Sequence, residues 1–349
     1  MQVVGVDLFC GAGGLTHGLK KAGIKVAAGV DIDPACKYPY EVNNGAKFLH
    51  KSVSEVTGKH LLSYYPVGAV KLLAGCAPCQ PFSKYAQGRP RDERWGLLYH
   101  FARLVDEMTP ELVTMENVPE LIKHEVYQEF KSKLLDSGYH VADKVMFGPD
   151  YGMAQTRRRL VLVASRLGEI DIIPATHKPA EYQTVRNAIA HLPSLNAGQT
   201  HHDDPLHRAG GLTEINLKRI RASKPNGTWR DWPADLIAKC HLKDSGKGYS
   251  SVYGRMSWDE PSPTMTTQCY GFGNGRFGHP EQDRAISLRE AAILQSFPDE
   301  YKFADRPENY NLTTLGRMIG NAVPVRLGEV VGLSIRKHLT AVNHSWPIV

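Results

Sequence analysis

The sequence predicts an α/β protein, with a doubly wound sheet covered by helices on both faces and a smaller, less regular second region. Through the first ~165 residues, short apolar runs alternate with amphipathic stretches. Such β-α-β alternation is typical of a sheet with helices on both faces. From 168 to 285 the chain is instead rich in Gly, Pro, His and Asn and has few periodic runs, which indicates a separate, irregular domain.

The expected strands and helices follow one another in the order that this sheet requires. Apolar runs predict strands at Val3–Phe9, Val26–Val30 and Val70–Ala74. Further strands are expected at Leu112–Met115, Tyr139–Phe147 and Leu160–Ser165. Helical spacing and start signals predict helices at Leu15–Ala22, from Pro34, at Gly96–Met108, Leu121–Leu135, Ser287–Gln295 and Pro324–Leu339.

The composition of the 349 residues is that of a soluble globular protein: 42% hydrophobic and 22% charged. We expect no membrane span and no secretory signal, and the six cysteines are expected to be free thiols, ligands or a nucleophile. The net charge is +6, and residues 151–230 hold 12 Lys and Arg against 6 Asp and Glu. That basic stretch suits nucleic-acid phosphates, although a solvated surface explains it equally well.

The first motif, DLFCGAGG at Asp7–Gly14, ends the first expected strand and opens the first helix. Glycines in such a turn let the backbone approach a ligand beside helix N–H groups. Asp31 and Asp33 end the next strand, where a carboxylate can bind ribose hydroxyls. These residues indicate a nucleoside-containing cofactor, with a plain tight turn as the alternative. The G-x-G-G spacing disfavours a dinucleotide.

The second motif, GCAPCQPFS at Gly75–Ser83, follows the strand at Val70–Ala74. A cysteine at the carboxyl end of a strand is where α/β enzymes place chemistry, and its thiolate is a strong nucleophile. Cys76-x-x-Cys79 could also be half of a zinc site with Cys240-His241, or a redox pair. Because Cys240-His241 does not have the spacing of a zinc arm, we favour the nucleophile and expect no metal.

Two further motifs carry polar groups at strand ends. Glu116 lies in MENVP, where it could protonate a substrate or simply be an exposed loop acid. QTRRRL enters a strand at 155–160, so Arg157 and Arg159 should point to one side and Arg158 to the other. Paired guanidinium groups suit phosphate or carbonyl oxygens, and a basic edge strand is the alternative.

In their order, these motifs resemble the DNA (cytosine-5) methyltransferases of the bacterial restriction–modification type. REAAILQSFP at 289–298 and GNAVP at 320–324 resemble the last two blocks of that family. The resemblance implies a Rossmann-like S-adenosylmethionine-dependent methyltransferase sheet. It also implies a catalytic, cofactor-binding domain at 1–180, a target-recognition domain at 181–285, a hinge and DNA-contact segment at 286–304, and a C-terminal return to the catalytic domain at 305–349.

The resemblance assigns the chemistry to four residues. Cytosine C5 accepts a methyl group once a thiolate has added to C6, which is covalent catalysis. Cys79 is implied as that thiolate, with Cys76 as a neighbour. Glu116, carrying a proton, is implied as the donor to N3. Arg159 would hold the cytosine O2 side and Arg157 would position the cysteine loop, while water is expected to remove the C5 proton.

The implied methyl donor is S-adenosylmethionine. Phe9 would stack near the adenine, the glycines would line the methionine end, and Asp31 would bind the ribose. Ser52 stands where the family usually has an Asp on the adenine amino group. The expected cofactor residues are Phe9, Gly11, Gly13, Gly14, Leu15, Asp31, Ile32, Ser52, Val53, Pro78, Asn321 and Val323.

The implied partner is double-stranded DNA, whose target base must be flipped out of the stack. Segment 80–96 is expected to close over the DNA, PTMTT at 263–267 to lie near the flipped nucleotide, and 246–255 to contact bases or backbone. The expected DNA-binding residues are Ser83, Gln87, Arg89, Arg91, Arg94, Thr264, Met265 and Arg255. We expect a monomeric, cytoplasmic prokaryotic enzyme, associated with the nucleoid through DNA. A cognate restriction endonuclease is allowed for, with no stable complex implied.

Three other functions compete with this one. The same fold could methylate tRNA, but that branch usually carries a Cys-Phe-Thr signature, and here Cys269 is followed by Tyr270-Gly271. A DNA-binding module without catalysis would be expected to have a damaged Cys or Glu motif, and both motifs are intact. A nicotinamide dehydrogenase is disfavoured by the G-x-G-G spacing.

Overall fold

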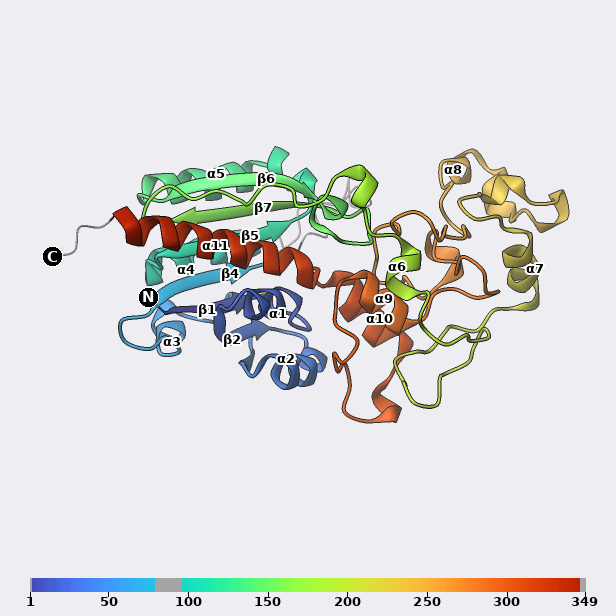
Figure 1. The fold of residues 1–349 in the computed structure, drawn as a ribbon, viewed down its shortest axis with the longest axis horizontal. Helices are drawn as coiled ribbons and strands as arrows, with labels where there is room; N and C mark the ends of the chain where they lie inside the picture. The colour runs from blue at the N-terminus through green and yellow to red at the C-terminus, as the bar shows by residue number, and fades with distance from the viewer. Residues whose placement is uncertain (1, 79–95, 346–349) are drawn as a thin grey trace. The chain divides into compact units, whose positions relative to one another are not determined.

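The structure is a computed structural model that describes residues 2–78 and 96–345. It divides into two compact units (Figure 1). The sheet unit comprises 1–147, 158–176 and 322–349, and the loop-rich unit comprises 148–157 and 177–321.

Seven strands form one sheet in the sheet unit, in the order β3-β2-β1-β4-β5-β7-β6. They are β1 Val3–Leu8, β2 Lys25–Asp31, β3 Lys47–His50, β4 Val70–Gly75, β5 Leu112–Asn117, β6 His140–Phe147 and β7 Arg158–Ser165. The pairs from β3 to β5 are parallel, and β7 is antiparallel to both β5 and β6. The strand order reverses between β1 and β4, and ligands of open α/β sheets bind outside the carboxyl ends of the strands at such a point.

Helices cover the sheet on both faces, as the sequence predicts (Figure 1). They are α1 Gly14–Lys21, α2 Lys37–Asn44, α3 Gly58–Leu62, α4 Leu97–Met108, α5 Glu125–Asp136 and α11 Val325–Ser345, with 3-10 turns at Pro34–Cys36 and Pro119–Lys123. In α4, Leu98, Phe101 and Val105 are buried at helical spacing, which is why this segment forms an amphipathic helix.

Helix α1 packs closely against α11. A Cβ atom on Gly18 would collide with the backbone of Val325, and one on Gly328 would lie 2.8 Å from the carbonyl oxygen of Leu15. Glycine at these two positions therefore lets the two helix backbones approach each other.

The sequence pattern did not predict strand β3, and it left the direction of β7 open. Strand β3 was not expected, because its four residues bury only Phe48 and Leu49. Strand β7 runs antiparallel because the chain between β6 and β7 contains only a 3-10 turn at Gly148–Tyr151 instead of a crossover helix. A parallel connection needs a dozen or more residues, usually including a helix.

The loop-rich unit contains short helices, and its described residues form only isolated β-bridges. The helices are α6 Val185–Ile189, α7 Glu214–Ala222, α8 Asp244–Lys247, α9 Leu288–Leu294 and α10 Leu312–Asn321. A small core of mainly aromatic and aliphatic side chains holds part of this unit together: Ile220, Trp229, Trp232, Leu236, Phe272 and Ala285. The high Gly and Pro content explains the shortage of long elements.

Residues 312–342 are the single described helical stretch that is long and apolar enough to span a membrane. Of its most apolar window, 72% is buried inside the protein. Burial of this kind is typical of core helices, so the stretch is weak evidence for a membrane segment.

Candidate active site

The turn after β1 has a strained and open backbone. Phe9 (φ 58°), Gly11 (φ 51°) and Gly13 (φ 93°) are all left-handed within five residues. A left-handed Phe costs energy, and such residues cluster at ligand sites. A Cβ atom on Gly11 would meet nothing within 4 Å, so open space adjoins this backbone. The turn therefore has the form of a ligand cradle at the start of α1.

Asp31 fixes this turn to the end of β2. Its Oδ2 accepts the N–H of Gly11 at 2.9 Å, and its Oδ1 accepts the N–H of Asp33 at 2.9 Å. Burial raises the pKa of Asp31, and these two N–H groups oppose the rise. The next side chain, Ile32, is 69% exposed. The carboxyl end of β2 therefore presents the oriented carboxylate of Asp31 beside an exposed apolar side chain.

The other expected cofactor residues differ in their environments. Gly14 opens α1, and the side chains of Leu15 and Val53 are buried. The Ser52 hydroxyl lies 2.6 Å from that of Ser54. Pro78 is half-buried, Val323 is buried, and Asn321, which belongs to the loop-rich unit, is exposed.

Asp7 is a buried acid that the sequence did not single out. Its Oδ2 accepts from Thr16 Oγ1 at 2.7 Å, and that hydroxyl lies 3.0 Å from the Tyr40 hydroxyl. Its Oδ1 is buried with no hydrogen-bond partner among the described residues. Burial raises the pKa of Asp7 to about 7. The polar side chains of Asp7, Thr16 and Tyr40 contact one another in sequence and so link β1 to α1 and α2.

Replacing Asp7 with asparagine should change how stability depends on pH. The folded state keeps the Asp7 proton up to about pH 7, whereas an ordinary Asp loses it near pH 4. In that window the folded state binds more protons, so stability is lost as pH rises through 7. Relative to the Asp7→Asn variant, the wild type should lose up to about 1.4 kcal/mol per pH unit. Urea unfolding at pH 5 and pH 8 measures this, and identical pH dependence of the two proteins would contradict it.

Glu116, at the carboxyl end of β5, is 4% exposed, so the alternative of an exposed loop acid is wrong. Its Oε1 lies 3.0 Å from Arg159 Nε, and its Oε2 accepts the thiol proton of Cys76 at 2.7 Å. Asn117 donates to the carbonyl oxygen of Ala77 at 3.0 Å, which ties the end of β5 to the segment after β4. A buried acid, a thiol and a guanidinium thus meet where β4 and β5 end and β7 begins.

The three arginines of QTRRRL have separate partners. Arg159 faces Glu116, whereas Arg158 is exposed and lies over the ring of Phe147 at 4.3 Å. This alternation is expected along a strand. Arg157 belongs to the loop-rich unit, where it donates to the carbonyl oxygen of Met265 at 2.9 Å.

Two buried glutamines, neither of them among the predicted site residues, organise the loop-rich unit around PTMTT. The Oε1 of Gln155 accepts the N–H of Met265 at 2.9 Å, and its Nε2 donates to Leu294 O and to Gln295 Oε1. Gln295 donates in turn to the carbonyl oxygen of Ile319 at 2.7 Å. This network and Arg157 together fix both backbone polar groups of Met265.

The structure does not support a DNA contact for Arg255. Its guanidinium is buried, and all five N–H groups have acceptors within the unit: Ser223 O, His279 O, Gln282 O, Ile220 O and Asp283 Oδ1. Met265 is 1% exposed and Thr264 is half-buried. The expected catalytic Cys79 and the expected DNA-binding Ser83, Gln87, Arg89, Arg91 and Arg94 lie outside the described residues.

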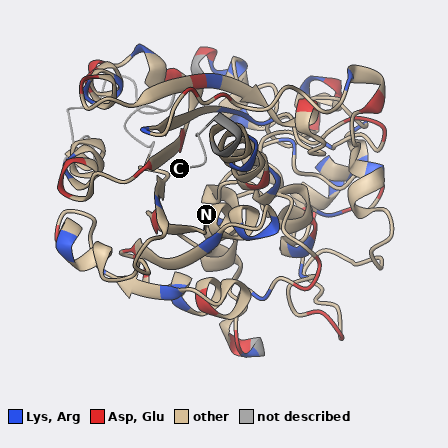
Figure 2. Cartoon of the chain, turned by 60° about the vertical axis from the view of Figure 1, so that its left-hand side comes forward, with Lys and Arg blue, Asp and Glu red and all other residues tan. Residues whose placement is uncertain are grey.

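Acidic and basic residues are interspersed along the ribbon (Figure 2). Several cations of the basic stretch 151–230 have partners within the loop-rich unit. Arg186 pairs with Asp259 at 2.9 Å and Arg221 with Asp283 at 3.1 Å, while Arg230 donates to a carbonyl oxygen. Part of the positive excess is therefore neutralised or engaged by the protein itself.

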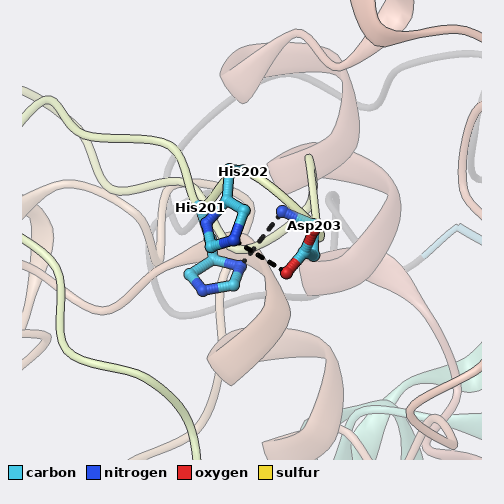
Figure 3. A group of neighbouring side chains, drawn as sticks. All are labelled: His201, His202 and Asp203. Atoms are coloured by element: carbon cyan, nitrogen blue, oxygen red, sulfur yellow. Dashed lines mark hydrogen bonds and ion pairs between the residues drawn. The ribbon is translucent and has the colours of Figure 1, made fainter.

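One group of described side chains has the donor atoms of a metal site: His201, His202 and Asp203 (Figure 3). Their candidate ligand atoms lie within 4.8 Å of one another. The side chains of His202 and Asp203 are about 80% exposed and pair with each other at 2.9 Å. This pairing explains their proximity without an ion.

The fold and site define a Rossmann-like methyltransferase: a glycine turn and a fixed carboxylate at β1 and β2, and a buried acid with a thiol and an arginine at β4, β5 and β7. Residues 3–337 match the C-5 cytosine-specific DNA methylase family. The chain belongs to this family and is a DNA cytosine-5 methyltransferase, as the order of its motifs predicts.

The relatives agree with this assignment. The chain is 53% identical to the Type II methylase M.HgiDII of Herpetosiphon aurantiacus over 97% of this chain and 96% of the relative. It is 33% identical to the Type II methyltransferase M.Eco47II of Escherichia coli over 97% and 80% of the two chains. These matches favour DNA over the tRNA alternative.

Solved structures share the fold. A methyltransferase of Entamoeba histolytica, EhMeth, has a TM-score of 0.68 at 16% identity, covering 97% of this chain and 99% of that chain. The Dnmt2 methyltransferase of S. pombe has a TM-score of 0.65 at 17% identity, covering 98% and 100%. These similarities confirm the predicted methyltransferase sheet.

Proposed function

We propose that this enzyme transfers the methyl group of S-adenosylmethionine to C5 of one cytosine within a specific duplex DNA sequence. We further infer that it is the modification enzyme of a restriction–modification system, because its relatives are named Type II methylases and methyltransferases. The observation that supports this chemistry best is the buried Glu116 carboxyl group held between Arg159 and the thiol of Cys76.

The residues at the ends of β1 and β2 fit the cofactor. S-adenosylmethionine, when bound, supplies an electrophilic methyl group. The open, left-handed backbone at Gly11 and Gly13 suits the methionine end, the Asp31 carboxylate suits the ribose hydroxyls, and the exposed Ile32 suits a flat apolar base such as adenine. Phe9 would lie on the other side of that base.

The protein's own groups would then carry the cytosine chemistry. The thiolate of Cys79 adds to C6 while Glu116 gives a proton or hydrogen bond to N3, which stabilises the negative charge that develops on the ring. With the cofactor bound, C5 would form a bond to the methyl carbon as the bond between that carbon and the donor sulfur breaks, its electron pair remaining on the sulfur. Water removes the C5 proton, and the electron pair of that C–H bond expels the Cys79 sulfur. Arg159 orients Glu116 and the O2 side of the ring.

We infer that residues 181–285 are the target-recognition domain, flanked by the hinge and DNA-contact segment at 286–304. Of the C-terminal return expected at 305–349, residues 322–349 belong to the sheet unit, whereas 305–321 belong to the loop-rich unit. The fixed backbone of Met265 makes PTMTT a rigid element, on which Thr264 can face the nucleotide. We also propose that the enzyme acts as a monomer in the cytoplasm, bound to the nucleoid through DNA, without a stable complex with its endonuclease.

The decisive experiment is to express the chain in a bacterial strain that lacks cytosine-5 methylation and to sequence 5-methylcytosine in its DNA and tRNA. A single methylated DNA motif is the expected result and also gives the recognition sequence. Methylated tRNA with unmodified DNA would instead establish the tRNA alternative.

Replacing Asp31 with asparagine should weaken S-adenosylmethionine binding about tenfold. The amide loses the charge that favours ribose hydroxyls, and one of its two groups becomes a donor facing the N–H of Gly11 or Asp33. Calorimetric titration of the cofactor into the protein without DNA measures this. The Asp136→Asn variant, in which an acid at the end of α5 is changed, serves as the control. Unchanged affinity in Asp31→Asn would remove Asp31 from the proposed cofactor site.

A further inference from the structure

Cys76 lies beside the catalytic machinery, and no step described so far uses its sulfur. Its thiol donates to Oε2 of Glu116 at 2.7 Å, and Arg159 Nε lies 3.0 Å from the other oxygen, Oε1. The side chain of Glu116 is 5% exposed. One oxygen of the carboxyl group therefore accepts a hydrogen bond from the chain after β4, while the other forms an ion pair with strand β7 and accepts no hydrogen bond from a described residue.

The physical consequence concerns orientation. A buried carboxyl group with one oxygen bound can still swing about its terminal torsion, which is broad and roughly two-fold. A second donor on the other oxygen removes that freedom before the base arrives, and such preorganisation is what an acid that meets a charged transition state requires. Because a thiol is a weak donor, Cys76 can orient the carboxyl group without binding its charge as firmly as a second guanidinium would.

We propose that Cys76 is a positioning residue for methyl transfer, whose S–H group fixes the orientation of the Glu116 carboxyl group towards the flipped cytosine. This inference rests on the proposed function and adds a role for the first cysteine of Cys-x-x-Cys that is neither nucleophile, metal ligand nor redox partner.

Two substitutions separate positioning from packing. Cys76→Ala removes the donor, and Cys76→Ser keeps one, while both side chains are smaller than cysteine. We expect Cys76→Ala to lower kcat about tenfold, or about 1.4 kcal/mol, with KM for DNA and cofactor unchanged. Cys76→Ser should stay within about twofold of the wild type. Equal losses in both variants would assign Cys76 to packing and overturn the proposal.

A double-mutant cycle tests whether the effect passes through Glu116. In a Glu116→Gln background, Cys76→Ala should cost less than about twofold further, measured as the single-turnover rate. A full tenfold loss there would also overturn the proposal. Thermal unfolding of each variant checks that it is folded, and Cys240→Ala, at an exposed cysteine of the loop-rich unit, is the matched control.

Different measurements would contradict the proposed function and the positioning role of Cys76. If the wild type does not methylate cytosine in DNA, the proposed function fails. If the wild type is active but Cys76→Ala is as active as the wild type, only the positioning role fails.

Discussion

Replacing Cys79 with serine is expected to abolish turnover. A serine hydroxyl stays protonated at neutral pH and is a far weaker nucleophile than a thiolate, so addition to C6 should no longer occur at a useful rate. Loss of a covalent nucleophile typically costs a factor of about 10⁴ or more. Transfer of a labelled methyl group to duplex DNA, followed over hours with excess enzyme, measures the residual rate.

The matched control is Cys76→Ser, which should retain most of the activity. Equal losses in the two cysteine variants would refute the assignment of Cys79 as the nucleophile. A duplex with 5-fluorocytosine at the target gives an independent readout, because no C5 proton can then leave. The wild type should form a denaturation-resistant protein–DNA adduct, and Cys79→Ser should form none. Absence of the adduct with the wild type would count against the covalent mechanism.

Replacing Glu116 with glutamine should lower kcat by about 10²–10³, the range for loss of a general acid. The amide has nearly the same size but cannot transfer a proton to N3. It also fits its surroundings poorly. Cys76 donates a hydrogen bond to one oxygen of Glu116 and the Arg159 guanidinium forms an ion pair with the other, so the amide NH₂ must face either a donor or a cation.

Single-turnover methyl transfer and adduct formation should both slow in Glu116→Gln, since the acid assists the first addition. The control is Glu111→Gln, at the entry of the same β5 region, where Glu111 pairs with Lys71 at 2.8 Å. That variant should lose some stability and less than twofold in kcat. A Glu116→Gln enzyme with wild-type kcat would show that the carboxyl group has no role as an acid.

The local sequence pattern predicted six of the seven strands of the sheet. Most of the predicted strands are apolar runs of four or more residues, a pattern that depends on the chain alone. Tyr139–Phe147, which contains His140, Asp143 and Lys144, is the exception. Strand β3 was missed because Lys47 and His50 flank only two buried residues. Helix α10, at Leu312–Asn321, was also not expected. Its burial depends on partners distant in the sequence.

The candidate site likewise has features that local sequence predicts and features that depend on residues distant in the sequence. The motifs placed Glu116 and the glycine turn correctly at strand ends, because strand direction and sheet order determine where carboxyl ends meet. Burial of a polar side chain is not a local property, however. The sequence therefore could not show that Asp7 and Gln155 are buried. Nor could it show that every N–H group of the Arg255 guanidinium donates to a carbonyl or carboxylate oxygen of its own unit.

The packing of α1 against α11 bears on the order in which the sheet unit can fold. Helix α1, at Gly14–Lys21, is synthesised about 300 residues before α11, at Val325–Ser345, which packs against it. The long sequence separation of these partners makes their docking a late folding event. A nascent chain that has not yet released residues 325–345 therefore lacks the helix that packs against α1, the helix that begins at the glycine turn.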